Sequence, residues 1–242
     1  MTALVIAGTG TGVGKTVVTA CLTNFFLKKN QSVCVYKPVQ TGTPKGLPPE
    51  DIDTIQHWLF ADSPPDSQFS GQCTYCLEAP AAPWVADCFR GTQPLPEVPG
   101  TIDPNQLVAV FQDLERRYDC VLVETAGGLR VPITQTWDTI ALIQALGVPV
   151  ILVTSPILGS INHTLLSYEA MVRADICVQG LVVSNYCRNE ESLAVDTFPA
   201  VIQALLPKSV TIEILPLLPL GPACFQTAVF QDLVAGKFTP LF

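Results

Sequence analysis

The feature that most constrains the fold is a glycine-rich segment near the amino terminus. Residues 8–16, GTGTGVGKT, directly follow the apolar run ALVIA and precede a helical pattern. A glycine loop that ends in Gly-Lys-Thr and lies between a strand and a helix is typical of a phosphate-binding loop. In such a loop, backbone N–H groups and the positive end of the helix stabilise a polyphosphate. The strict pattern has a glycine where this chain has Thr9. The neighbouring glycines still supply the unusual backbone angles that the loop needs.

The end of this loop carries phosphate and metal chemistry. The Lys15 ammonium is placed to reach β- and γ-phosphate oxygens, and the Thr16 hydroxyl is placed to bind Mg²⁺. A glycine-rich turn without a ligand is the alternative. Because Gly-Lys-Thr is intact between a strand and a helix, the sequence favours a nucleotide-binding loop.

The charge balance limits the kinds of partner that the protein is expected to bind. The chain holds 13 Lys and Arg against 21 Asp and Glu, a net charge of −8, whereas binding to nucleic acid or to an anionic membrane requires a basic surface. No apolar run reaches the roughly 18 residues that span a bilayer. The first residues lack the charged region of a secretory signal. We therefore predict a cytoplasmic protein that binds neither nucleic acid nor a membrane.

Nine cysteines are expected to be mostly reduced in that compartment. Two of them, Cys73 and Cys76, form a Cys-x-x-Cys pair in a predicted short strand. A zinc site is disfavoured because the chain has no second such pair and only two histidines. A redox pair would be expected at the start of a helix. The pattern therefore favours no function for this pair.

Apolar, β-branched runs alternate with helical patterns along the rest of the chain, which is typical of a parallel sheet covered by helices on both faces. We predict a single doubly wound α/β domain over residues 1–242, of the P-loop NTPase type, with a mostly parallel sheet. Residues 61–100 are expected to be mostly loop with one short helix. Asp103 and Pro104 mark a helix start. The predicted strands are 3–8, 33–37, 120–124, 149–154, 178–184 and 211–215, and the predicted helices are 15–29, 51–60, 104–117, 137–146, 161–174 and 192–206.

Ligands of such sheets bind beyond the carboxyl ends of the strands, and polar residues stand there. Lys37 ends the second predicted strand, where its ammonium would stay near phosphates or a charged substrate. A lysine that reaches solvent is the alternative. Thr41, in the same KPVQTG segment, is expected to face the same crevice.

Two further strand ends complete the predicted site. Glu124 ends the strand CVLVE, at the position of the carboxylate that holds Mg²⁺ in phosphate-loop enzymes. Asp53, or less favourably Asp51, would complete the metal ligands, although either also suits a helix start as an acid. Asn185 offers the donor and acceptor that an adenine edge requires. A turn-forming asparagine is the alternative.

Five segments give the chain a resemblance to dethiobiotin synthetases. GTGTGVGKT, YKPVQTG, VETAGG, LGSINH and VVSN occur in the order and context of that family, from residue 3 to about 185. Its loop is similar to GTxTxVGKT, with threonine where Thr9 stands. The likeness fades toward the carboxyl terminus.

The resemblance implies ATP-dependent closure of a ureido ring in biotin biosynthesis. 7,8-Diaminononanoate takes up CO₂ as a carbamate, ATP phosphorylates the carbamate, and the second amine displaces phosphate to give dethiobiotin. The two anions must be held within reacting distance. The implied catalytic residues are Lys37, Lys15 and Thr11, and the implied Mg²⁺ ligands are Thr16, Asp53 and Glu124.

The resemblance also implies binding residues and an assembly. Thr41 would bind the reacting end of the substrate, and Gly159, Ser160 and Asn162 would bind its distant carboxylate at a helix start. In the family this helix start belongs to the partner subunit, which implies a homodimer. The implied nucleotide-binding residues are Gly12, Val13, Gly14, Lys15, Thr16, Val17, Asp53, Glu124, Thr125, Ala126, Gly127, Asn185, Leu215, Pro216 and Leu217.

The chain departs from the family pattern at two positions. Thr125 stands where members usually have glycine, and its branched side chain is expected to crowd the nucleotide or shift the loop. Gly12 stands where some members have glutamate.

Two other classes share this sheet or chemistry. Switch ATPases of the septum-positioning or plasmid-partition kind carry a signature lysine where Gly10 stands. An amidoligase of the cobyrinate type would need an ammonia source, and no glutaminase-like Cys–His pairing is apparent in the sequence.

Overall fold

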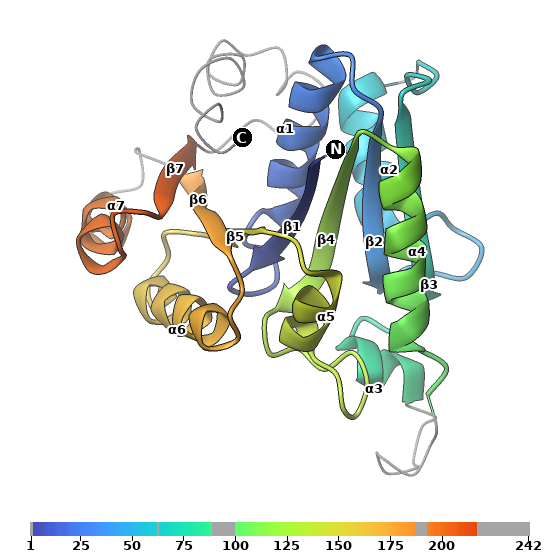
Figure 1. Cartoon of the computed structure of the whole chain (residues 1–242). Helices are drawn as coiled ribbons and strands as arrows, with labels where there is room; N and C mark the ends of the chain where they lie inside the picture. Colours follow the sequence, from blue (N-terminus) through green and yellow to red (C-terminus); the bar gives the residue numbers. More distant parts are fainter. Residues whose placement is uncertain (1, 62, 89–99, 187–192, 217–242) are drawn as a thin grey trace.

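A computed structural model describes residues 2–61, 63–88, 100–186 and 193–216. Within them, seven strands form one sheet in the order β3-β2-β4-β1-β5-β6-β7, flanked by helices on both faces (Figure 1). Every pairing between these strands is parallel, which confirms the predicted doubly wound α/β class. The strands are β1 (Thr2–Gly8), β2 (Val33–Thr41), β3 (Phe69–Leu77), β4 (Cys120–Gly128), β5 (Val150–Thr154), β6 (Val178–Tyr186) and β7 (Thr211–Pro216).

Seven helices connect the strands within the described residues. Two of them begin with a side-chain cap: Asp103 accepts from the Asn105 N–H, as the sequence predicts for this start, and Asp138 accepts from the Ala141 N–H. The helices are α1 (Lys15–Lys28), α2 (Glu50–Phe60), α3 (Pro83–Cys88), α4 (Pro104–Arg117), α5 (Thr139–Leu146), α6 (Ser160–Arg173) and α7 (Leu193–Leu205). None of them is long and apolar enough to cross a membrane.

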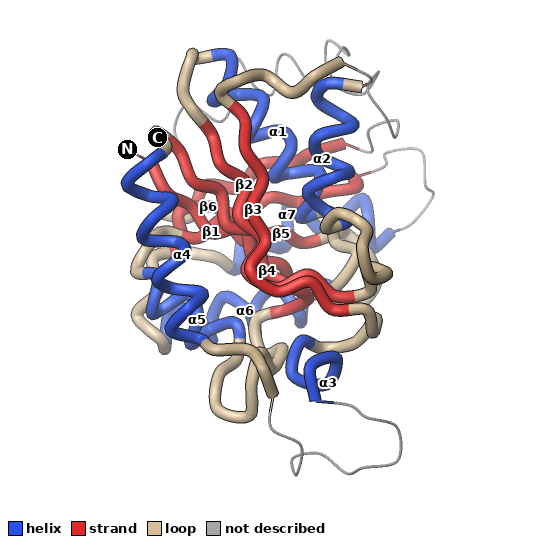
Figure 2. Tube along the Cα trace, turned by 90° about the vertical axis from the view of Figure 1, so that its right-hand side faces the viewer, coloured by secondary structure: helices blue, strands red, loops and turns tan. Residues whose placement is uncertain are grey.

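The central strand β1 divides the core into two halves. Leu4 and Ile6 pack on one face of the sheet against residues of α1 and α2. Val5 and Ala7 face the other half, to which α4, α5, α6 and α7 contribute. Figure 2 shows α4 and α5 on this side, away from α1 and α2. These four strand residues are at most 1% exposed, because a parallel sheet is covered on both faces and its strands are therefore apolar throughout.

The region 61–100 contains more structure than the sequence predicts. Besides the short helix α3 it holds β3, a nine-residue strand at the edge of the sheet that pairs with β2 from Val33↔Phe69 to Thr41↔Leu77. Cys73 and Cys76 lie on this strand, as expected, and are not joined by a disulfide. The proline-rich residues 94–99 lie outside the described ranges.

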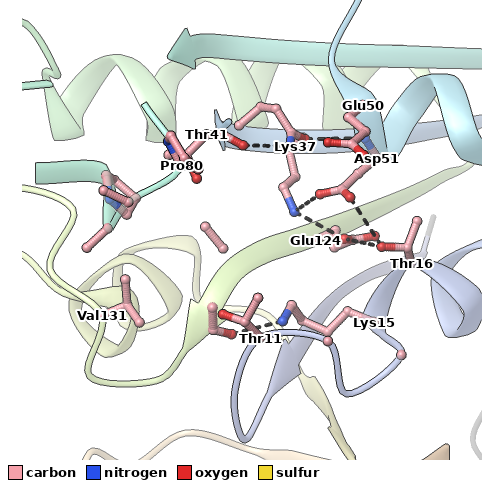
Figure 3. Close-up of a pocket in the computed structure, with 18 of the residues that line it drawn as sticks. Thr11, Lys15, Thr16, Lys37, Thr41, Glu50, Asp51, Pro80, Glu124 and Val131 are labelled. Carbon is pink, nitrogen blue, oxygen red and sulfur yellow. Dashed lines mark hydrogen bonds and ion pairs between the residues drawn. The ribbon is translucent and has the colours of Figure 1, made fainter. Parts of the chain in front are cut away.

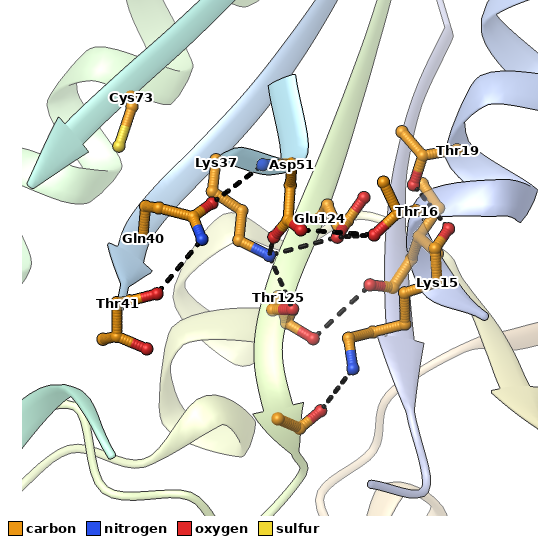
Figure 4. Close-up of polar contacts among 12 residues, drawn as sticks. Lys15, Thr16, Thr19, Lys37, Gln40, Thr41, Asp51, Cys73, Glu124 and Thr125 are labelled. Atoms are coloured by element: carbon orange, nitrogen blue, oxygen red, sulfur yellow. Dashed lines mark hydrogen bonds and ion pairs between the residues drawn. The ribbon is translucent and has the colours of Figure 1, made fainter. Parts of the chain in front are cut away.

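Side chains along β2 point alternately to the two faces of the sheet, and this alternation is interrupted near Pro38. Val35 packs in the core on the α1 side, whereas Val39, four residues later, packs in the core on the opposite side. A regular strand would place both on the same face. The pairing of β2 with β4 also stops just before this point, at Tyr36↔Val123. Beyond it the two strands separate, and Lys37 and Gln40 both reach the space near α2 (Figure 4).

Candidate active site

The glycine loop leads from β1 into α1, and its last glycine has no side chain that could accept from the N–H groups of the helix start. Gly12 and Gly14 have φ of 73° and 100°, in the left-handed region that favours glycine. Gly14 is the N-cap of α1, and no side chain in the described part of the protein caps this helix start. Its first N–H groups are therefore available to a phosphate, where the helix dipole favours negative charge.

Lys15 lies against this loop without a carboxylate partner in the described residues. Its Nζ donates to the carbonyl oxygen of Gly10 at 2.8 Å and to that of Gly127 at 3.0 Å. The side chain is buried, with 7% of the residue exposed. Burial, followed by the nearby charge of Lys37, lowers the pKa of Lys15 to about 8. An anion bound in the loop would offset both effects and raise the pKa of Lys15 again.

Lys37 lies in the opposite situation, between two carboxylates. Its Nζ is 2.5 Å from Asp51 Oδ2 and 3.1 Å from Glu124 Oε1, and it is 3.4 Å from the Thr125 carbonyl oxygen (Figure 4). Burial alone would lower the pKa of Lys37, but the charges of Glu124 and Asp51 outweigh burial and raise it. Lys37 is therefore held as a buried cation.

Three oxygen-bearing side chains converge beside Lys37. Thr16 Oγ1 donates to Glu124 Oε1 at 3.0 Å and lies 3.4 Å from Asp51 Oδ1. Glu124 is 1% exposed, and its Oε2 has no hydrogen-bond partner among the described residues. A buried carboxylate oxygen without a partner calls for a further cation or donor. Oxygen ligands of this kind suit Mg²⁺, which takes its remaining ligands from water and phosphate.

The structure places Asp51 at this point and Asp53 away from it. Asp51 lines the cavity, whereas Asp53 is exposed on α2. The two residues are two positions apart, about 200° around a helix, so they cannot face the same site. Asp51 precedes the buried Ile55 by four residues and shares its face. That spacing is the sequence signal that favours Asp51.

These groups line one cavity of about 690 Å³ at the carboxyl end of the sheet (Figure 3). Thr41, at the end of β2, also lines it. Opposite the charged groups the wall is apolar, formed by residues 80–83 and Val131. The lining residues that the sequence singled out are Thr11, Gly12, Gly14, Lys15, Thr16, Val17, Lys37, Thr41, Glu124, Ala126 and Gly127.

Some of the remaining predicted residues lie away from this cavity, and others fall outside what the structure describes. Val13 is buried against the α1-side core, and Leu215 is in the same core with 1% exposure. Asn185 and Pro216 belong to β6 and β7, but their side chains lie outside what the structure describes, as does Leu217 entirely. The segment with Gly159, Ser160 and Asn162 forms the start of α6 and does not line this cavity.

Thr125 does not crowd the phosphate side of the site. Its side chain is buried, and its Oγ1 donates to the Ile6 carbonyl oxygen of the neighbouring strand at 3.4 Å. It faces a small space lined by α5 residues such as Thr139 and Leu142, rather than the large cavity. The alternation of β4 explains this, because Val123 and Thr125 share the face opposite α1.

Sequence reasoning missed one buried polar residue of the cavity, Gln40. Its side chain contacts the Asp51 N–H and the Thr41 carbonyl oxygen, and only 5% of the residue is exposed. Simple alternation from Lys37 would point Gln40 to the opposite face. The change of phase near Pro38 places it on the side of Lys37 instead.

The fold and this site define a nucleotide-binding protein of the P-loop class. Among solved structures, a plasmid partition protein from Borrelia burgdorferi superposes with a TM-score of 0.61 at 12% identity, covering 100% of this chain and 99% of that one. The MinD cell division protein from Aquifex aeolicus gives 0.56 at 15% identity, with 97% and 94% covered. At these identities the likeness shows the fold alone.

The sequence comparisons are more specific. A family model described as an AAA domain matches residues 2–223. A relative from Mycobacterium avium is 34% identical over 98% of this chain and 96% of its own, and one from Anoxybacillus flavithermus is 35% identical over 75% and 77%. Both are named ATP-dependent dethiobiotin synthetase BioD. The chain belongs to the ATP-dependent dethiobiotin synthetase family.

Proposed function

We propose that this chain is an ATP-dependent dethiobiotin synthetase of biotin biosynthesis, which closes a ureido ring on 7,8-diaminononanoate with CO₂. One amine nitrogen bonds to CO₂ and releases a proton, giving a carbamate. A carbamate oxygen then attacks the γ-phosphorus of ATP, the bond to the β-phosphate oxygen breaks, and ADP leaves. The second amine attacks the carbonyl carbon of the mixed anhydride, loses a proton, and phosphate leaves to give dethiobiotin.

The observation that carries this proposal is the presence of two buried lysines in one cavity at the phosphate loop. Phosphorylation of a carbamate brings together two anions, the carbamate and the γ-phosphate. Lys15 and Lys37 come from different elements, and the charge of Lys37 is close enough to lower the pKa of Lys15. Fixed charges in a water-poor cavity stabilise developing negative charge without reorganisation. Lys15 would act on the phosphates, and Lys37 on the transferring group.

Magnesium fits the residues beside Lys37. Thr16, Glu124 and Asp51, in place of Asp53, would hold the ion, and the unpartnered Glu124 Oε2 supports this assignment. When bound with ATP, Mg²⁺ neutralises charge on the β- and γ-phosphates. The protein side chains fix where that charge is neutralised relative to Lys37.

The substrate would lie between Thr41 and the apolar wall of the cavity. Thr41 would hydrogen-bond the reacting end, and Pro80 and Val131 offer an apolar surface for a methylene chain. The cavity shares Thr11 and Val131 with a second hollow of about 410 Å³, which reaches His163 and Leu166 on α6. Thr11 and Val131 thus stand between the charged site and the hollow that borders α6.

We also propose that the enzyme acts as a homodimer through the surface around the start of α6. Ile157, Leu158 and Leu166 are 61%, 91% and 56% exposed in the single chain. Grouped apolar side chains at such exposure are typical of an interface. Gly159, Ser160 and Asn162 would then contribute to the substrate site of the partner subunit.

We place the reaction in the cytoplasm. The seven cysteines in the described part of the chain are all reduced thiols, which is the state that a reducing compartment maintains.

A turnover assay tests the proposed function. The protein is mixed with the diamine, bicarbonate and Mg²⁺, and each nucleoside triphosphate is supplied in parallel while dethiobiotin and phosphate are measured. We expect stoichiometric dethiobiotin and phosphate that depend on the diamine. Triphosphate hydrolysis that ignores the diamine would contradict the proposal and favour a switch ATPase.

A further inference from the structure

We propose that Gln40 is a positioning residue that holds the Asp51 carboxylate at the metal and phosphoryl site. The proposal rests on the function proposed above, and in particular on Asp51 as a metal ligand. Gln40 itself would touch neither the metal nor the phosphates. Its action would pass through the backbone of α2 and through Thr41.

Gln40 joins two elements of the site. Its Oε1 accepts from the Asp51 N–H at 3.4 Å, and its Nε2 donates to the Thr41 carbonyl oxygen at 3.2 Å (Figure 4). One end of the amide therefore contacts the residue proposed to bind Mg²⁺, and the other contacts the residue proposed to bind the substrate. A buried amide with both ends engaged has one preferred orientation.

Helix α2 lacks a cap of its own. Its N-cap residue is Pro49, and no side chain at that position accepts from the helix. In α4 and α5, by contrast, Asp103 and Asp138 cap their own first turns. Free N–H groups at a helix start need an acceptor. Gln40 supplies one from the neighbouring strand, at the second residue of α2.

This contact fixes where the helix begins, and hence where Asp51 points. The loop that precedes α2 is exposed over residues 44–48 and offers little packing to the helix start. The buried residues of α2, Ile52 and Ile55, anchor the helix on the side of the core. Gln40 is the polar anchor at the other side, where the Asp51 carboxylate contacts Lys37 and Thr16.

The test replaces Gln40 with methionine, which has similar length and no hydrogen-bonding amide. The measurements are Mn²⁺ binding to the protein–ADP complex by electron paramagnetic resonance, and ADP binding in EDTA. We expect Gln40→Met to weaken Mn²⁺ binding about tenfold, the usual effect of removing a group that orients a metal ligand. ADP binding in EDTA is expected to be unchanged, because it uses the glycine loop and Lys15.

Gln72→Met is the matched control. Gln72 also lies on a strand, and its Nε2 also donates to the carbonyl oxygen of the next residue, Cys73, at 3.3 Å. It is exposed and, unlike Gln40, does not line the cavity. We expect wild-type Mn²⁺ affinity in this variant.

A second variant keeps the proposal testable if methionine disturbs folding. Gln40→Glu loses the donor to the Thr41 carbonyl oxygen but retains an oxygen that accepts from the Asp51 N–H, so it tests the contact with α2 separately. Mn²⁺ affinity should stay within about threefold of wild type, well short of the loss expected for methionine. Equal affinities in wild type and Gln40→Met, or a tenfold loss in Gln40→Glu, would overturn the proposal. A wild-type protein that binds Mn²⁺ and ADP but forms no dethiobiotin would instead refute the proposed function, so the two failures are distinguishable.

Discussion

The two buried lysines of the cavity lie in neighbouring regions that are built in different ways. Around Lys15 the site is made of backbone: glycine angles, helix N–H groups and two carbonyl oxygens. Around Lys37 it is made of side chains, with Asp51 and Glu124 in direct contact. The pKa of Lys15 is lowered to about 8, chiefly by burial, whereas the pKa of Lys37 is raised because the two carboxylates outweigh burial.

This difference separates two functions within one cavity. The region of Lys15 has a surplus of donors, and no described carboxylate contacts Lys15 directly, so this region is suited to receive a triphosphate from outside. The region of Lys37 already contains both signs of charge, so it is suited to fix positions rather than to attract a ligand. The first region would therefore determine binding, and the second would determine what happens to the bound phosphate.

The largest effect is expected from Lys37→Ala. Turnover should fall about 10³-fold, because a fixed charge at the transferring group is lost, while ADP binding persists through the loop. The measurements are dethiobiotin formation and ADP titration by calorimetry. Lys45→Ala, at an exposed lysine of the loop after β2, is the control and should be unchanged. Near-normal turnover in Lys37→Ala would remove Lys37 from the mechanism.

The same comparison predicts opposite effects on stability. Lys37→Met leaves Glu124 buried without its cation and should lower the free energy of unfolding by about 3 kcal/mol at pH 7. Lys15→Met removes a buried charge that has no carboxylate partner, so the free energy of unfolding should stay within about 1 kcal/mol of wild type or increase. Urea unfolding of the two variants without nucleotide measures both. Equal losses would show that the two regions do not differ in this way.

A smaller effect is expected at Thr125, on the far face of β4. Thr125→Gly removes a buried side chain and adds backbone freedom, so the protein should lose about 1–2 kcal/mol of stability. Turnover should remain within about twofold of wild type at 25 °C, because the side chain faces away from the cavity. The checks are the thermal midpoint and kcat with saturating substrates. A marked rise in kcat would mean that Thr125 does constrain the nucleotide.

The smallest effect is expected at the amino ends of β2 and β4, outside both regions. Asp119 accepts from the Ser32 N–H at 2.9 Å and from its hydroxyl at 2.8 Å, and these bonds lower the pKa of this exposed carboxyl below 3.8. A lowered folded-state pKa contributes stability above the unfolded-state value, and this contribution is lost as the pH falls through the folded-state value. Asp119→Asn should therefore be slightly destabilised at pH 7, and the difference from wild type should shrink below pH 3.8.

That pH dependence is measured by urea unfolding of both proteins from pH 7 to pH 3. Turnover at pH 7 should be the same in both. A stability difference that does not change with pH would mean that the contact does not depend on the Asp119 charge.

Much of the site could be predicted because its signals are local. The glycine loop is read from nine consecutive residues, and Lys37 and Glu124 each end an apolar run. The prediction that both residues end their strands is wrong, because β2 continues to Thr41 and β4 to Gly128. The parallel strands nevertheless bring the two side chains together toward the carboxyl end of the sheet. Lys37 Nζ and Glu124 Oε1 lie 3.1 Å apart although 87 positions separate the residues.

The parts that sequence missed depend on tertiary packing. The sequence predicts only a short strand around Cys73 and Cys76, whereas β3 has nine residues; it carries Gly71 and Gln72 in its first half and is only partly buried, so its apolar pattern is weak and its full length depends on pairing with β2. The choice of Asp51 over Asp53 depends on which face of α2 packs on the core. The role proposed for Gln40 depends on the change of phase near Pro38, which simple alternation does not predict.

The contacts of Lys37 also have a consequence for the order of folding. The phosphate loop is a local segment between one strand and the next helix. The ion pair with Glu124, by contrast, closes 87 residues of chain, and the bond from Thr16 to Glu124 closes 108. Contacts of such long range form only once the strands between them are in register. The phosphate loop shares this dependence, because its Lys15 donates to the Gly127 carbonyl oxygen 112 positions away. Chemistry on a bound phosphate would therefore begin only after β1, β2 and β4 have assembled.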